Sequence, residues 1–176
     1  MTGAVLTQNT SWKNVAKALQ ALTNHVNSFS EILETSLGEL KMLIRPAGFF
    51  NQKAAYLKSI AQLFIETRGN PSRNELLACK GVGPETADAI LLYALSQPSL
   101  VVDSYTRRIL ARVLGRTDFL KAKYSKLQEE LMNSLPKEPL ELRLFHTLLI
   151  VHGQAVCHKL KPVCDRCPAL DICAHA

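Results

Sequence analysis

The sequence contains no apolar run of the roughly 18 to 20 residues that a membrane-spanning helix needs. Its N-terminus also lacks the basic stretch followed by an apolar run that marks a secretory signal peptide. No repeat of solenoid period and no low-complexity linker is present. These absences exclude a membrane protein, a secreted protein and a solenoid, so we expect a soluble cytoplasmic protein that makes no membrane contact.

Convincing strand alternation is absent as well, whereas apolar residues recur with helical period along the whole chain. The pattern predicts an all-α protein. Capping residues place several helix ends, among them a capping box of Ser72 and Glu75 and N-caps at Asn51 and Asp103. The predicted helices cover 12–23, a short stretch near 29–33, 37–44, 51–67, a helix opening at 72, and then 83–96, 103–115, 124–135 and 140–152.

Acidic residues are fewer than basic ones, 15 against 21, which gives a net charge of +6. A basic protein favours an anionic partner, and nucleic acid is the usual candidate. Hydrophobic residues make up 47% of the 176 residues, which supports a packed protein rather than a disordered one. The composition therefore indicates one sizeable domain, or two small ones that share a core.

Cysteine is scarce outside one segment. In a reducing cytosol, a cluster of cysteines indicates a metal site rather than disulfides. The spacing, C-x6-C-x2-C-x5-C, supplies four soft thiolates that can surround one zinc ion or one iron–sulfur cluster, and spacing alone leaves both open. A fifth cysteine, Cys79, is expected to be a small buried residue. The four candidate ligands are Cys157, Cys164, Cys167 and Cys173.

Two glycines separate amphipathic helices at Gly81-Val82-Gly83. Glycine allows a positive φ and the close approach of another group. The amides of Val82 and Gly83 would point outward at the start of the next helix, whose dipole favours an anion such as a DNA phosphate. Many helical hairpins turn on glycine without binding anything, so the motif by itself leaves both interpretations open.

Asp103 follows the apolar triplet Leu100-Val101-Val102 and precedes a helix. Its simplest role is that of an N-cap. A carboxylate at this place could also stabilise positive charge on a sugar while an N-glycosidic bond breaks, or activate water. The two roles are compatible. Three arginines on the same helix either contact DNA or form surface salt bridges, namely Arg107, Arg108 and Arg112.

The run from Leu76 to Gly115 resembles the helix-hairpin-helix and Gly/Pro-Asp signature of the endonuclease III-like (HhH-GPD) DNA glycosylases. The segments 6–10 and 48–54 resemble two further parts of that family, so the likeness covers essentially the whole chain. It implies a two-lobed helical fold that binds double-stranded DNA and flips a damaged base into a pocket. One lobe would be 10–115, with the helix-hairpin-helix at about 72–96. The other would combine 1–9 with 116–176, end in a cluster loop at 157–173, and lack an N-terminal segment that relatives carry.

The resemblance also implies roles for single residues. Asp103 matches the catalytic aspartate of the family. The cysteine spacing is similar to the [4Fe–4S] loop of endonuclease III, which makes an iron–sulfur cluster the expected cofactor. A monovalent cation, Na⁺ or K⁺, would lie against the hairpin carbonyls of Leu77, Cys79 and Val82. The expected DNA contacts are Gln8 and Phe49, which fill or wedge the gap left by the flipped base, Gly81, Val82 and Gly83 of the turn, and the charged Lys159 and Lys161.

One position departs from the strand-cutting members of the family, which carry a lysine where this chain has Glu85. A carboxylate cannot form the imine that lyase chemistry needs. The segments 6–12 and 44–49 resemble the 3-methyladenine glycosylase branch, in which Glu85 and a stacking Trp12 would favour a cationic purine. Tyr105 is a second base-pocket candidate.

We therefore expect a monomeric, nucleoid-associated, monofunctional glycosylase for an alkylated purine. The alternatives are a bifunctional glycosylase and lyase that acts on oxidised pyrimidines, and a non-catalytic module that recognises DNA structure.

Overall fold

The computed structural model describes residues 1–175, and its regular elements within that range are all helical, which confirms the all-α prediction. No helix of the described residues is long and apolar enough to cross a membrane. The α-helices are α1 (Thr2–Leu6), α2 (Trp12–Thr23), α3 (Phe29–Glu34), α4 (Leu37–Leu43), α5 (Phe50–Glu66), α6 (Arg73–Ala78), α7 (Pro84–Ala89), α8 (Ser104–Val113), α9 (Tyr124–Ser134) and α10 (Pro139–Ala155).

The chain packs as two units, one from Met1 to Ile90 and one from Leu91 onward. The first unit holds α1 to α7 and the second holds α8 to α10. This boundary differs from the lobes predicted from the sequence, 10–115 against 1–9 with 116–176, and those lobes stay a prediction. The boundary places the glycine turn in the first unit and Asp103 in the second.

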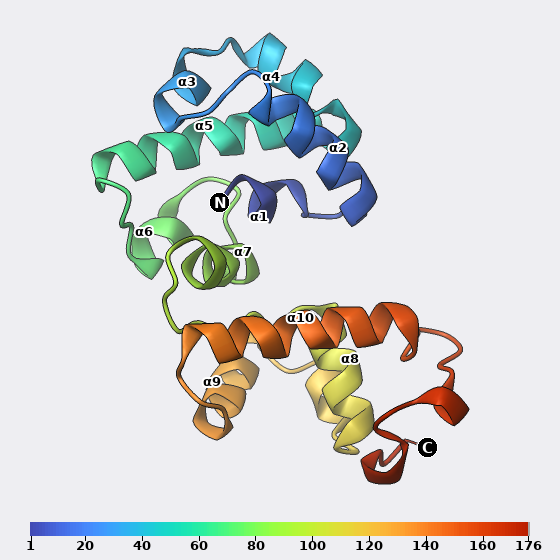
Figure 1. Ribbon diagram of the computed structural model, residues 1–176. Helices are drawn as coiled ribbons and strands as arrows, with labels where there is room; N and C mark the ends of the chain where they lie inside the picture. Colours follow the sequence, from blue (N-terminus) through green and yellow to red (C-terminus); the bar gives the residue numbers. More distant parts are fainter. Residues whose placement is uncertain (176) are drawn as a thin grey trace. The chain divides into compact units, whose positions relative to one another are not determined.

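Helix α5 is the centre of the first unit and contacts α1, α3, α4 and α6. Figure 1 shows α3 and α4 on one side of α5 and α1 on the other. The reason is the spacing of its apolar residues, which recur at helical period and form one continuous face. Its fully or almost fully buried apolar side chains are Ala54, Leu57, Ile60, Ala61 and Phe64.

Short polar side chains fix several helix starts. The hydroxyl of Ser72 accepts from the backbone N–H of Glu75, and the Glu75 carboxylate accepts from that of Ser72, so the predicted capping box is confirmed. Two other predicted ends are wrong. The N-cap of α5 is Phe49, not Asn51, because the chain enters this helix from a left-handed backbone conformation. The helix predicted over 83–96 ends at Ala89 and continues as a π-helical turn, Ile90–Ala94.

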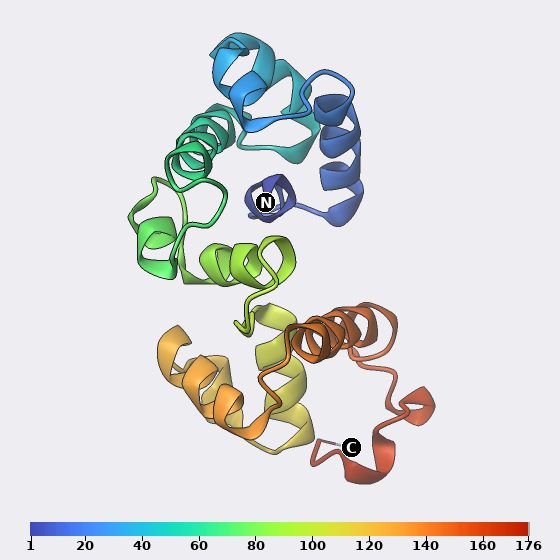
Figure 2. The same cartoon turned by 60° about the vertical axis from the view of Figure 1, so that its left-hand side comes forward.

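Helices α8 and α10 pack against each other in the second unit. Figure 2 shows this pair beside the C-terminal loops that carry the cysteines. Ile109, Leu149 and Cys157 form the buried centre of the contact. Gly153 lies where a Cβ would overlap the Tyr105 ring, so the absence of a side chain there lets the two helices approach.

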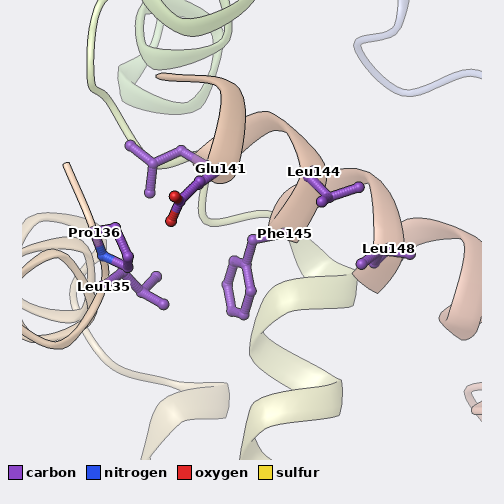
Figure 3. Close-up of a pocket in the computed structure, with 7 residues that line it drawn as sticks. Leu135, Pro136, Glu141, Leu144, Phe145 and Leu148 are labelled. Atoms are coloured by element: carbon purple, nitrogen blue, oxygen red, sulfur yellow. The ribbon is translucent and has the colours of Figure 1, made fainter. Parts of the chain in front are cut away.

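One face of α10 is apolar and open to solvent. Its exposed residues recur every three or four positions, the spacing of a single helix face. Leu144, Phe145 and Leu148 of this face line a hollow of about 460 Å³ whose other wall is Leu135 and Pro136, just after α9 (Figure 3). The exposed apolar residues are Leu140, Leu144, Leu148 and Val151.

Candidate active site and cysteine loop

The glycine turn of the first unit is built on a close contact. Gly81 has a φ of +83°, and a Cβ added there would overlap the ring of Tyr56 from α5. Glycine adopts this positive φ at low cost and has no Cβ to overlap the ring, and no other residue type does both. The N–H of Val82 donates to the carbonyl of Cys79 at 3.1 Å. Because that amide is used inside the turn, the anion-binding prediction rests on Gly83, the N-cap of α7. Cys79 is partly exposed, where the sequence suggested a buried residue.

Gln8 lies against this turn. Its side-chain amide donates to the carbonyl of Gly81 and to the hydroxyl of Thr86, both at 2.9 Å. The contact with Gly81 spans 73 residues of sequence, and together the two bonds join the loop after α1 to the turn and to α7. Gln8, a predicted DNA contact, therefore lies against the hairpin that is predicted to bind a phosphate.

Two aromatic side chains of the first unit point away from its core. Phe49 and Trp12 each expose 61% of their surface. Phe49 also has a φ of +46°, in the left-handed region that costs a bulky residue roughly 1–2 kcal/mol. Strain of this kind persists where the surrounding structure fixes the backbone, and it is concentrated at functional sites. The exposed, strained ring fits the predicted wedge, which stays a prediction.

A buried lysine fixes the loops that carry Gln8 and Phe49. Lys53 exposes 1% of its surface, and its ammonium group donates to the carbonyls of Leu6 and Ala47, both at 2.9 Å. Each of these carbonyls lies two residues before a predicted DNA contact. Burial lowers the pKa of Lys53. The lysine thus ties together, from inside the core, two loops that are 41 residues apart (47 − 6).

We expect the substitution Lys53→Met to lower the free energy of unfolding by about 1–3 kcal/mol, because it leaves two buried carbonyls without donors. The loss should grow toward alkaline pH. A lowered pKa means that the unfolded chain binds this proton more tightly, so the lysine adds stability as the pH rises toward its ordinary pKa, and methionine does not. Urea unfolding at pH 7 and pH 9 measures both effects.

Lys58 provides the matched control for this experiment. It lies on the same helix and donates to the carbonyl of Leu33 at 2.7 Å, but it is half-buried, and its bond joins α5 to α3 rather than to either loop. Lys58→Met should therefore cost less stability than Lys53→Met. Equal losses for the two variants would contradict the special role of Lys53.

Asp103 is the N-cap of α8, as predicted. Its Oδ1 accepts from the Thr106 backbone N–H at 2.8 Å and from the Thr106 hydroxyl at 3.0 Å. Its Oδ2 lies 3.5 Å from Nε2 of His146 on α10, and its side chain is 14% exposed. The cap therefore occupies one carboxylate oxygen, and the other faces His146.

The protonation state of Asp103 follows from these contacts. Burial raises the pKa of the carboxyl, but the contact with His146 and the two donors of Thr106 outweigh burial and leave the pKa below its usual range. A carboxylate that is partly buried and still ionised at neutral pH can stabilise a nearby positive charge, because little water screens it.

The residues that follow Asp103 have packing roles in the structure. Tyr105 lies against Gly153, with the Arg108 guanidinium 5.0 Å from its ring centroid, and its predicted place in a base pocket stays untested. Arg107 donates to the carbonyls of Phe119 and Ala122. All three arginines of α8 donate to backbone carbonyls, which adds a structural role to the two interpretations that the sequence left open.

The cysteine loop begins at Cys157, which is buried against α8. Arg112 donates to its sulfur at 3.2 Å and to the carbonyl of His158 at 2.8 Å, and Arg108 donates to the Cys157 carbonyl at 3.2 Å. The loop lysines, Lys159 and Lys161, are exposed.

The four loop cysteines are all free thiols. Within residues 1–175, no three cysteine, histidine, aspartate or glutamate side chains converge as ligands of one metal ion. The thiolates around a four-iron cluster bind different iron atoms and stand further apart than the ligands of a single ion. By donor chemistry, four thiols with a guanidinium beside one of them therefore fit an iron–sulfur cluster.

The sequence analysis missed two residues of these sites. His146 is one of them, because no sequence pattern pairs a histidine of this apolar helix with Asp103. Lys53 had a signal. It stands at a core position of α5, one turn before Leu57, where the periodicity calls for an apolar residue.

The known proteins that resemble this chain are DNA repair proteins of one kind. A family model described as HhH-GPD superfamily base excision DNA repair protein matches residues 2–137. A protein of Methanocaldococcus jannaschii named as a DNA repair glycosylase is 43% identical over 184 residues, which cover 97% of this chain and 82% of the relative.

Two solved structures have the same fold. A non-covalent endonuclease III–DNA complex superposes with a TM-score of 0.84 at 26% identity, covering 99% of this chain and 81% of that chain. The H. pylori 3-methyladenine DNA glycosylase bound to 1,N6-ethenoadenine superposes with a TM-score of 0.70 at 31% identity, covering 87% of this chain and 82% of that chain. The similarity extends over nearly the whole chain in the first case and most of it in the second.

Proposed function

The chain belongs to the HhH-GPD superfamily of base excision DNA repair proteins, and from this premise we propose that it is a monofunctional DNA glycosylase, which removes a damaged base and leaves the strand uncut. The observation that carries the proposal is the carboxylate of Asp103, which is mostly buried, ionised, and has one oxygen held by Thr106. Its chemistry is hydrolysis of the bond between the base and the sugar.

Asp103 acts on the charge that develops in this reaction. As the glycosidic bond breaks, its electron pair leaves with the base and the sugar becomes cationic. The carboxylate stabilises that cation, and water then adds to the sugar and gives up a proton to the carboxylate, which releases it to solvent. The low pKa of Asp103 keeps the carboxylate charged at neutral pH.

Glu85 supports hydrolysis over strand cutting. It lies in the first turn of α7, directly after the glycine turn and Pro84, where the strand-cutting relatives carry a lysine. A carboxylate has no nitrogen with which to form an imine. The endonuclease III likeness keeps a bifunctional enzyme for oxidised pyrimidines as the alternative, but that enzyme would need an amine from elsewhere, and the nearest lysine in sequence, Lys80, stands on the other side of the turn.

The substrate we propose is an alkylated purine. Alkylation puts positive charge on the base, and a negative Glu85 with an exposed Trp12 would favour such a base by charge and by stacking. The similarity to a 3-methyladenine DNA glycosylase supports this class. Gln8, Phe49 and the glycine turn would contact the duplex around the extruded nucleotide.

An iron–sulfur cluster completes the proposal. Cys157, Cys164, Cys167 and Cys173 would hold a [4Fe–4S] cluster, which supplies a rigid anchor for the loop when it is bound. The loop would then present Lys159 and Lys161 to the phosphate backbone. A monovalent cation at the carbonyls of Leu77, Cys79 and Val82, and a monomeric state, belong to the same proposal.

A strand-cleavage assay tests the proposed reaction. A duplex with one 3-methyladenine, incubated with the protein, should break after treatment with alkali and stay intact without it, since alkali cuts only where the base is missing. Breaks without alkali, together with a borohydride-trapped protein–DNA adduct, would show lyase chemistry and contradict the assignment of Glu85. Binding at low salt without base release would instead favour a non-catalytic module.

A further inference from the structure

His146 makes contacts on both sides of its ring. It lies on α10 and is 6% exposed. Its Nδ1 is 2.7 Å from the hydroxyl of Tyr93, and its Nε2 is 3.5 Å from Oδ2 of Asp103. No hydrogen-bond partner reaches that buried Nε2 among the described residues, so the Asp103 carboxylate is the acceptor group that it faces at longer range. The ring therefore bridges Tyr93 and Asp103.

The two contacts determine where the ring carries its proton. If Nδ1 carried the only proton, the bare lone pair of Nε2 would face a carboxylate oxygen, and the two would repel. If Nε2 carries it, Nε2 donates toward Asp103, and the Tyr93 hydroxyl donates to Nδ1. Electrostatics thus favours an N–H on Nε2 that points at the oxygen left free by the helix cap.

Tyr93 is suited to the outer position. It stands in the π-helical turn Ile90–Ala94, a type of distortion that is frequent at functional sites. Its hydroxyl also lies 3.3 Å from that of Thr147. Burial raises the pKa of Tyr93, the Thr147 contact and the charge of Arg143 lower it, Asp103 raises it, and the net shift is upward. The phenol therefore keeps its proton in the neutral range and can donate it to His146.

We propose that His146 is a positioning residue for Asp103, held in orientation by Tyr93, and that it aims Oδ2 of Asp103 at the sugar. This inference rests on the proposed catalytic role of Asp103. The cap through Thr106 holds Oδ1, and the His146 N–H, 3.5 Å from Oδ2, would restrict rotation of the carboxylate during the reaction. Arg143 is the other charged group near this arrangement.

The first experiment needs no enzyme activity. In ¹⁵N-labelled protein, NMR of the His146 ring should show the proton on Nε2, and the Nε2–H signal should shift in Asp103→Asn. It should broaden in Tyr93→Phe, because the ring loses its tether. Leu148→Gln, an exposed change on the same helix, should leave it unmoved. A neutral ring with its proton on Nδ1 would overturn the proposal.

The second experiment measures single-turnover excision of 3-methyladenine. His146→Leu should slow it roughly 10- to 100-fold, as loss of one hydrogen bond to a charged group does. His146→Gln, whose amide can donate from a similar place, should recover part of the rate, and DNA affinity should stay unchanged in both variants. Thermal melts establish that the variants are folded.

The pH dependence separates positioning from a merely structural role. The His146 contact helps to keep the pKa of Asp103 low, so its removal should move the acid limb of the pH–rate profile to higher pH. An unmoved acid limb, or a rate equal to that of Leu148→Gln, would overturn the inference. If the unaltered protein excises no base, the proposed function fails instead, and the NMR result still decides whether His146 donates to Asp103.

Discussion

Replacing Asp103 with asparagine should abolish base excision while the protein keeps its fold and its affinity for damaged DNA. Asparagine caps a helix about as well as aspartate, so α8 should still begin at Ser104. The negative charge is lost, and with it the stabilisation of a cationic sugar. We expect a fall of roughly 10²- to 10⁴-fold in the single-turnover rate, the range for loss of an acid–base group. A gel assay with alkali treatment measures the rate, and fluorescence anisotropy measures binding.

Asp103→Ala separates the two roles of this residue. It removes the cap as well as the charge and should cost about 1 kcal/mol more in stability than Asp103→Asn. The pH dependence has a definite sign. Because the folded pKa of Asp103 is lowered, its ionised form adds stability at neutral pH, and this is lost as the pH falls through the folded pKa. Asp103→Asn should lack that dependence. Near-normal turnover by the asparagine variant would refute the catalytic assignment.

The substitution Cys157→Ala should remove the cluster. The unaltered protein should be brown, absorb near roughly 400 nm and contain about four iron atoms per chain, as expected for a [4Fe–4S] centre. Cys157 is the buried member of the set, and its sulfur accepts from Arg112. Its loss should bleach the absorbance and lower the melting temperature, because a bound metal centre contributes to folding.

Cys79 is the control for that experiment, because it lies in the other unit and outside the loop. Cys79→Ala should keep the colour, the iron and the sulfide. Zinc in place of iron in the purified protein, or full absorbance in Cys157→Ala, would argue against the cluster. Measuring iron and acid-labile sulfide in both variants settles the comparison without any DNA substrate.

Local sequence patterns predicted the helices well. The helix predicted over 12–23 matches α2, and the capping box at Ser72 was identified from its spacing alone. Both depend on interactions within a few residues, which a sequence displays directly. The start of α5 was misplaced because an aromatic residue takes the left-handed conformation there, a choice that only the surrounding structure can impose.

The candidate site was predicted in part. Asp103 was identified as an N-cap because Leu100-Val101-Val102 and a helix flank it. Its contact with His146, 43 residues further on (146 − 103), depends on how α8 packs against α10. The carbonyls that the arginines of α8 bind could not be predicted for the same reason, since they become neighbours only in the fold. Long-range polar contacts have no periodicity, so a single sequence does not reveal them.

The left-handed backbone at Phe49 has a consequence for engineering. Glycine or asparagine adopts that conformation at little cost, so either would suit the loop better than a bulky ring does. A directed-evolution campaign that rewards heat resistance alone would therefore discard the ring early. If Phe49 is the wedge, such a campaign would yield a protein that is more stable to heat but binds damaged DNA less well.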